Sequence, residues 1–177
     1  MNGWLIDWIE TAQLNLQNLR ILVVGCGLGD DAEYLAKLGA KVTAFDLSQT
    51  AIDWCRHRFP TSQVSYQAVD LFAAPAEWKL SFDLVIEIYT IQALPANIRP
   101  NAIDCIGNFV APNGKLFVVC RGRDPEDACD NLPFPLTKAE LNRFTDGGLN
   151  QISFADSIDT LDTAPARRFR IVYERPN

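Results

Sequence analysis

The segment Arg20–Leu47, with the sequence RILVVGCGLGDDAEYLAKLGAKVTAFDL, decides the fold of this chain. It opens with the apolar run Ile21–Val24, which is typical of a buried strand. Gly25, Gly27 and Gly29 follow, and glycine is favoured at such a turn because it adopts positive φ freely and lets a ligand approach the backbone closely. We therefore expect a strand that ends in a glycine loop.

A helix and a second strand follow the loop. Apolar residues at positions 32, 35 and 36 recur at helical spacing, and Gly39 stands where a C-terminal cap is expected. Lys41–Phe45 then predicts a second strand, which ends on Asp46. Strand, glycine loop, helix, strand and acid make up a nucleotide-binding half of a doubly wound sheet, in which the acid accepts hydrogen bonds from a ribose diol.

Two carboxylates at the start of this helix bear on which nucleotide is bound. A dinucleotide would place its pyrophosphate at the helix N-terminus, where Asp30 and Asp31 would repel it and compete for the positive end of the dipole. S-adenosylmethionine has no phosphate and carries a sulfonium and an ammonium group, so it fits this loop better. The alternative interpretation is that both aspartates only cap the helix.

The same residues resemble a known family. VVGCGLGDD followed by VTAFDLS resembles motif I and the second-strand acid of class I S-adenosylmethionine-dependent methyltransferases. More narrowly, GCGxGxD with the later PFPLTKAEL is similar to the thiopurine methyltransferase-like small-molecule branch. One position departs from the wider pattern, because Val23 stands where many members carry an acid. Asp30, Asp31 or carbonyl oxygens of the loop must then receive the methionine ammonium.

Composition narrows the class of protein further. The chain has 177 residues, of which 48% are hydrophobic and 21% charged, and a formal net charge of −6. That balance argues against nucleic acid as the partner. Five cysteines without a CxxC pair or Cys/His cluster predict free thiols and no metal site. No apolar run is long enough to span a bilayer and no basic signal region opens the chain, so we expect a cytoplasmic protein without a membrane partner.

The remaining elements can be placed by pattern and turn residues. Helices are expected over Gly3–Leu16, over Gln49–Arg58 behind a Ser48 cap, from Pro95 to about Phe109, and from a Thr137/Glu140 capping box to Gly147-Gly148. The cap is reinforced by an expected apolar contact between Leu136 and Leu141. Strands are expected over Val64–Val69, Ser81–Tyr89, Lys115–Cys120, Asn150–Phe154 and Arg168–Glu174. The remaining ranges read as a turn at Pro112–Gly114, a flap over Pro125–Pro135 and a loop over Asp156–Pro165.

The family resemblance assigns cofactor contacts to the ends of the first four strands. Asp70 follows the third strand and corresponds to the acid that accepts from the adenine amine, with the next apolar side chains over the ring. Glu87 lies at the end of the fourth strand, where it would orient the cofactor or a substrate proton. The expected cofactor-binding residues are Gly25, Cys26, Gly27, Gly29, Asp31, Asp46, Leu47, Asp70, Leu71, Phe72 and Glu87.

Residues for the acceptor and for catalysis are harder to name. The segment Glu87–Thr90 is not the (Asp/Asn)-Pro-Pro-(Tyr/Phe) tetrad of nucleic-acid amino methyltransferases, which counts against a base as acceptor. Glu87 and Tyr89 are the catalytic candidates, although an anionic nucleophile needs no strong base. The candidates for substrate contact are Trp4, Tyr89, Gln92, Arg121 and Phe134, with core packing the alternative role for Trp4 and plain solvation for Arg121.

These observations together predict a Rossmann-like, doubly wound α/β fold. The expected sheet has seven mostly parallel strands with helices on both faces, and its last strand is antiparallel. Residues 1–177 would form a single methyltransferase domain in which 1–18 is a helical lid. The expected function is methyl transfer to a small-molecule acceptor by in-line displacement, in a monomer or homodimer. The alternatives are an S-adenosylmethionine-binding protein without catalysis and a nicotinamide-dependent oxidoreductase.

Overall fold

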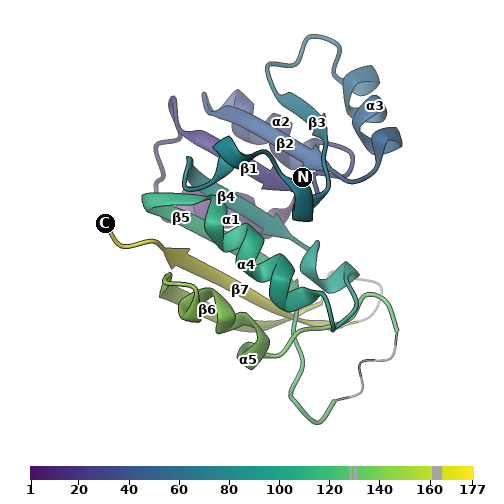
Figure 1. The fold of residues 1–177 in the computed structure, drawn as a ribbon, viewed down its shortest axis with the longest axis vertical. Coiled ribbons are helices and arrows are strands. Elements are labelled where there is room, and N and C mark those ends of the chain that lie inside the picture. Colours follow the sequence, from purple (N-terminus) through teal and green to yellow (C-terminus); the bar gives the residue numbers. More distant parts are fainter. Residues whose placement is uncertain (128, 130, 161–164) are drawn as a thin grey trace.

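The computed structural model describes residues 1–127, 129, 131–160 and 165–177 and contains a seven-stranded sheet (Figure 1). The strands lie in the order β3-β2-β1-β4-β5-β7-β6. Their bounds are β1 Arg20–Val24, β2 Lys41–Asp46, β3 Ser65–Ala68, β4 Phe82–Ile88, β5 Val110–Arg121, β6 Asn150–Asp159 and β7 Ala166–Glu174. Strands β1 to β5 pair in parallel, whereas β7 is antiparallel to both β5 and β6. The predicted fold class is confirmed.

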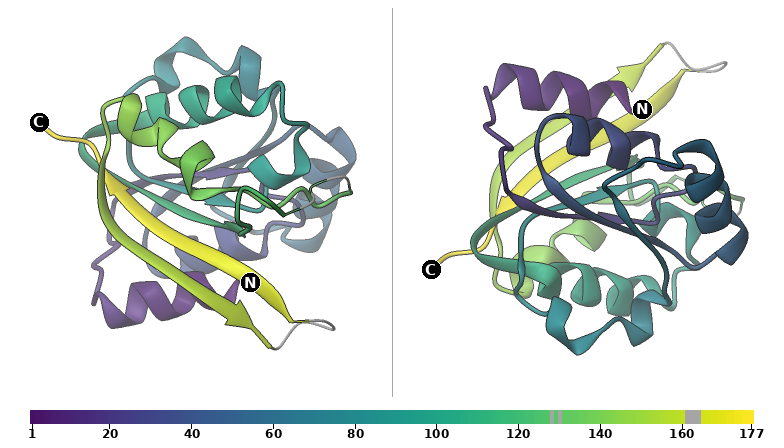
Figure 2. Two further views of the ribbon diagram at one scale, coloured as in Figure 1. Left: turned by 90° about the horizontal axis from the view of Figure 1, so that it is seen from below. Right: turned by 90° about the horizontal axis from the view of Figure 1, so that it is seen from above.

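Helices cover both faces of this sheet, as Figure 2 shows for α1 and α4 on opposite sides. Buried residues of α1, α2 and α3 pack on one face, and those of α4, α5 and α6 on the other. The α-helices are α1 Gly3–Thr11, α2 Asp30–Lys37, α3 Gln49–Arg58, α4 Arg99–Phe109, α5 Lys138–Leu141 and α6 Arg143–Asp146. The short 3₁₀ helices in the described part of the chain are η1 Leu71–Ala73, η2 Ala76–Trp78 and η3 Ile91–Ala93.

The central strands are apolar on both faces because both faces are covered. In β1, Leu22 and Val24 join the core under α4, while Ile21 and Val23 join the core under α1 and α2. This alternation fixes the register, since a shift by one residue would exchange the two faces. The carboxyl ends of the parallel strands are thereby brought to one edge of the sheet.

Several element boundaries differ from those predicted. Helix α1 ends at Thr11 rather than Leu16, because Gln13 takes a left-handed φ of 48° that no helix continues through. Helix α4 begins at Arg99, since a turn closed by the Ile98 N–H on the Pro95 carbonyl precedes it.

The C-terminal third departs further from the sequence reading. The capping box of Thr137 and Glu140 is present, and Leu136 and Leu141 are both buried in the core under α4, but the helix it starts is split at Asn142 into α5 and α6. The expected loop over 156–165 was wrong in part, because β6 continues to Asp159 and β7 begins at Ala166. Residues 161–164 of that expected loop lie outside the described residues, as do 128 and 130 of the expected flap.

The turn expected at Pro112–Gly114 is an irregularity within β5. The strand already pairs with β4 at Val110, and the register then shifts before Lys115. Gly114 is packed so tightly that a Cβ there would lie 2.8 Å from the Ala111 carbonyl oxygen and 2.9 Å from that of Phe82. A side chain at this position would therefore push the two strands apart.

No helix in the described ranges is long and apolar enough to cross a membrane.

We predict that Gly114→Ala lowers the free energy of unfolding by about 1–3 kcal/mol, the usual cost of overpacking. Gly3→Ala is the matched control, because Gly3 has no atom near its hypothetical Cβ and alanine favours a helical position. Urea denaturation followed by circular dichroism measures both variants. Equal stability of Gly114→Ala and the parent would contradict the close approach of the two strands.

Candidate functional site

A cavity of about 380 Å³ opens at the carboxyl ends of the first four strands. It lies where the chain reverses from the β1-β2-β3 half of the sheet to the β4-β5 half, the place at which open α/β sheets bind ligands. Its volume falls within the roughly 300–1,000 Å³ usual for ligand sites. The lining residues are Val24, Gly25, Phe45, Asp46, Leu47, Val69, Asp70, Leu71, Phe72, Ile88, Tyr89, Thr90, Ala93 and Leu94.

The glycine loop is held by its own backbone and by its neighbours. The Cys26 N–H donates to the Phe45 carbonyl at 2.8 Å, and the Gly29 N–H donates to the Cys26 carbonyl at 3.0 Å. Gly25 and Gly29 have positive φ angles of 59° and 84°. A Cβ on Gly25 would lie 2.3 Å from the Thr90 hydroxyl oxygen, so no larger residue fits without displacing that side chain.

Asp46 connects this loop to the segment that follows β2. Its carboxylate accepts from the Gly27 N–H at 3.0 Å and from the Ser48 N–H at 2.9 Å. Each carboxylate oxygen can accept more than one hydrogen bond. Asp46 can therefore fix the loop and still receive donors from a ligand in the cavity.

Asp70 lines the same cavity from the end of β3. Its Oδ1 accepts from the Phe72 N–H at 2.9 Å and so caps η1, which carries Leu71 and Phe72 along the wall. Phe72 is 42% exposed and Leu47 75% exposed, which is unusual for large apolar side chains. An apolar, planar group would find contact surface between these residues and an acceptor in Asp70.

The two aspartates at the start of α2 are engaged elsewhere. Asp30 forms an ion pair with Arg58 at 2.9 Å, and the hydrogen bonds from that guanidinium lower the pKa of Asp30. Asp31 accepts from the Asn2 N–H at 2.6 Å, while burial raises its pKa. Asp31 thus ties the start of α1 to the glycine-loop helix, and neither aspartate lines the cavity.

Glu87 lies beneath the cavity and is not part of its lining. It is fully buried, and its Oε1 accepts from the Thr90 N–H at 2.7 Å and the Ile91 N–H at 2.9 Å. Among the described residues its Oε2 has no hydrogen-bond partner. Burial raises the pKa of Glu87 to about 7, against the lowering effect of the two N–H groups. A carboxyl so placed supports the turn that carries Thr90 and Ile91.

Tyr89 does line the cavity, in a backbone conformation that is rare outside glycine. Its φ is 67°, and its N–H donates to the Val119 carbonyl at 3.0 Å. The buried Arg168 guanidinium lies 5.4 Å from the centre of its ring. The ring is therefore held between the cavity and β7.

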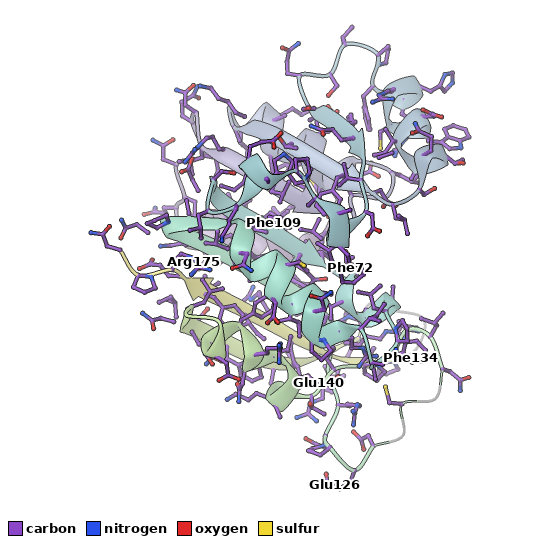
Figure 3. All side chains as sticks on the ribbon, in the orientation of Figure 1. Phe72, Phe109, Glu126, Phe134, Glu140 and Arg175 are labelled. Carbon is purple, nitrogen blue, oxygen red and sulfur yellow. The ribbon has the colours of Figure 1, made fainter. Side chains whose placement is uncertain are left out.

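The other substrate candidates lie outside the cavity. Gln92 is buried, and its Oε1 accepts from the Arg121 N–H at 2.6 Å while its carbonyl accepts from the Phe134 N–H at 2.8 Å. These three residues join η3, the end of β5 and the loop before α5, and Figure 3 shows Phe134 well apart from Phe72. Trp4 packs against the core under α1, with the Arg170 guanidinium 5.5 Å from its ring centre.

The structure thus brings together only part of the expected site. The expected residues in the lining are Gly25, Asp46, Leu47, Asp70, Leu71, Phe72 and Tyr89. Those outside the lining are Trp4, Cys26, Gly27, Gly29, Asp31, Glu87, Gln92, Arg121 and Phe134. The lining residues that sequence reasoning missed are Val24, Phe45, Val69, Ile88, Thr90, Ala93 and Leu94. Phe45, Val69 and Ile88 are direct neighbours of residues that were predicted at the strand ends, so their position at the strand ends could have identified them. No sequence pattern marks Ala93 and Leu94 as lining residues.

Solved structures share this fold across nearly the whole chain. A SAM-dependent methyltransferase from Methanosarcina mazei superposes with a TM-score of 0.79 at 18% identity, over 95% of this chain and 97% of that chain. TehB from Haemophilus influenzae gives a TM-score of 0.79 at 15% identity, over 99% of this chain and 62% of that chain. Magnesium protoporphyrin IX methyltransferase from Synechocystis PCC 6803 with bound SAM gives 0.73 at 18%, over 97% and 76%. At such identities the likeness establishes the fold.

Sequence comparison establishes the family. Ubiquinone biosynthesis O-methyltransferase of Xanthomonas oryzae pv. oryzae is 35% identical over 128 residues, which are 71% of this chain and 52% of that protein. Ubiquinone biosynthesis O-methyltransferase of Dechloromonas aromatica is 31% identical over 129 residues, which are 71% of this chain and 54% of that protein. The chain spans about half the length of these curated relatives. The profile of the family described as "Methyltransferase domain" matches residues 21–114, more than half of the chain, which therefore belongs to the class I S-adenosylmethionine-dependent methyltransferases.

Proposed function

We propose that this protein is an S-adenosylmethionine-dependent methyltransferase that methylates a small-molecule acceptor by in-line displacement. The observation that carries the proposal is the pair of acids, Asp46 and Asp70, which end two adjacent strands and line one partly apolar cavity. A nucleoside presents a diol and an exocyclic amine as donors on a flat apolar body. Two carboxylates flanked by Leu71 and Phe72 match that chemistry.

The proposed cofactor contacts follow from this arrangement. Asp46 would accept from the ribose hydroxyls, and Asp70 from the adenine amine, with Leu71, Phe72 and Leu47 against the ring. The loop Gly25–Gly29 would pass close to the amino-acid tail, whose ammonium would meet its carbonyl oxygens or Asp31. When bound, the cofactor supplies an electrophilic methyl group on a sulfonium. The carboxylate acceptors that line the cavity fit such a ligand.

In this reaction the protein would mainly align the acceptor with the methyl group and exclude water. Of the two catalytic candidates, Tyr89 lies in the cavity lining, where its ring can contact the acceptor. Glu87 is buried below the cavity, so we assign it no contact with the reacting atoms. We also propose that residues 1–177 act as one methyltransferase domain with residues 1–18 as its lid, supported by the contact of Asn2 with Asp31.

The acceptor is proposed at the level of its class. The curated relatives are named for ubiquinone biosynthesis and one structural neighbour for magnesium protoporphyrin IX, which supports a small molecule. The thiopurine methyltransferase-like branch remains our finer proposal and rests on GCGxGxD and PFPLTKAEL. The net charge of −6 supports the absence of a nucleic-acid partner.

We predict that S-adenosylhomocysteine binds the protein in calorimetric titration and that NAD does not. Asp46→Ala should weaken this binding at least about tenfold, because hydrogen bonds to a charged group contribute roughly 1.5–3 kcal/mol. Asp53→Ala is the matched control, since Asp53 lies on α3 outside the cavity and its side chain is 63% exposed. Binding of NAD alone would overturn the proposal.

A second measurement separates an enzyme from a protein that only binds the cofactor. We expect methyl transfer from labelled S-adenosylmethionine to at least one member of a panel of small thiols, phenols and carboxylates. Tyr89→Ala should reduce that transfer more than it weakens binding of S-adenosylhomocysteine. Tight binding without transfer to any panel member would favour the binding protein over the enzyme.

A further inference from the structure

A chain of contacts links the end of β4 to the first glycine of the loop. The Thr90 hydroxyl donates at 3.1 Å to the carbonyl of Val24, the last residue of β1. The same hydroxyl and the methyl group of Thr90 pack against Gly25, where a Cβ would lie 2.3 Å and 2.9 Å from them. Thr90 therefore sets both the position of Gly25 and the point at which the loop leaves β1.

Thr90 is itself fixed from below by a carboxyl group. Glu87 Oε1 accepts from the backbone N–H groups of Thr90 and Ile91, which start the turn into η3. Glu87 is fully buried, so solvent does not compete for these bonds. The turn also includes Tyr89 with its φ of 67°, a conformation that persists only where the surroundings enforce it.

We infer that Glu87 and Thr90 are positioning residues, which act together as a clamp that holds the glycine loop in its binding conformation. Neither role was expected from the sequence, where Glu87 was a catalytic and cofactor-binding candidate and Thr90 was not a candidate for the site. The Thr90 hydroxyl spans the seam between β1 and β4, the two strands on either side of the chain reversal. The clamp would set the shape of the cavity floor before any ligand arrives. This inference deepens the proposed function and rests on it for its effect on cofactor affinity.

The test compares three substitutions of threonine. Thr90→Val keeps the branched shape and removes the hydroxyl, whereas Thr90→Ser keeps the hydroxyl. Thr43→Val makes the same chemical change within β2, at a residue that does not line the cavity. We expect S-adenosylhomocysteine to bind about five- to tenfold more weakly to Thr90→Val, the effect of one lost hydrogen bond, and nearly normally to Thr90→Ser and Thr43→Val.

Hydrogen exchange supplies a readout that needs no ligand. The loop amides are all hydrogen-bonded: those of Cys26 and Gly27 donate to Phe45 and Asp46 of β2, and that of Gly29 donates to the Cys26 carbonyl. Their exchange should be faster in Thr90→Val than in Thr90→Ser at a temperature where both variants are fully folded. Unchanged exchange and unchanged affinity in Thr90→Val would overturn the clamp. Failure of the parent protein to bind S-adenosylhomocysteine would instead refute the proposed function, and the exchange rates would still decide the inference.

The burial of Glu87 gives a separate prediction for pH. Its folded pKa of about 7 exceeds the ordinary value of 4.5, so the folded state holds this proton more tightly than the unfolded state. The group therefore favours folding most below pH 4.5, and that contribution is lost as pH rises from 4.5 to about 7. The negative charge of Glu87 contributes to raising the pKa of the Cys120 thiol of β5 and of the Tyr173 hydroxyl of β7, after burial as the larger cause for both.

Glu87→Gln should remove this pH dependence, because an amide side chain does not titrate in this range. Its oxygen can still accept from the Thr90 and Ile91 N–H groups, so the turn should be retained. We expect the stability of the parent relative to Glu87→Gln to fall between pH 4.5 and 7 in urea titrations. Glu77→Gln is the control, because Glu77 lies on η2 and is exposed. Parallel stability curves for the parent and Glu87→Gln would show that Glu87 is not buried as described and would remove the base of the clamp.

Discussion

The carboxylate of Asp46 is the contact on which the geometry of the cavity depends. It joins the Gly27 N–H of the glycine loop to the Ser48 N–H, and Ser48 in turn caps α3. The carbonyl of Asp46 also accepts from the Val69 N–H at the end of β3. One residue thus holds together a loop, the start of a helix and the end of a neighbouring strand. Two of these segments reach the lining, the loop through Gly25 and the strand end through Val69 and Asp70.

Asp46 can do this because the sheet beneath it leaves little freedom. β1 is buried on both faces, so its register against β2 and β4 is fixed by packing on each side. The strand therefore ends at the same level as its neighbours, and the glycine loop starts where Thr90 from β4 can reach it. Apolar burial sets the height of the strand ends, and hydrogen bonds then set the shape of the loop. The cavity follows from these two steps in that order.

The sequence predicts those parts of the site that depend on local pattern. Strand, glycine loop and acid recur at spacings that a single half of the sheet dictates, so Asp46 and Asp70 were placed at the edge where the structure has them. Contacts between residues far apart in the sequence could not be foreseen. Arg58 forms an ion pair with Asp30, and the Asn2 N–H donates to Asp31. The sequence pattern around the two aspartates gives no sign of either partner, so the argument from their charge could not include them. Glu87 was a catalytic candidate for the same reason, because its position between the neighbouring strands β1 and β5 is set by residues far away in the sequence.

A crystal structure with S-adenosylhomocysteine tests the central claim most directly, namely that this cavity is a nucleoside site held by two strand-end acids. The account predicts electron density for the ligand in the cavity, with the ribose hydroxyls in hydrogen-bond contact with Asp46 and the adenine amine with Asp70. Density for the ligand elsewhere on the protein, or in the cavity without contact to either carboxylate, would contradict it.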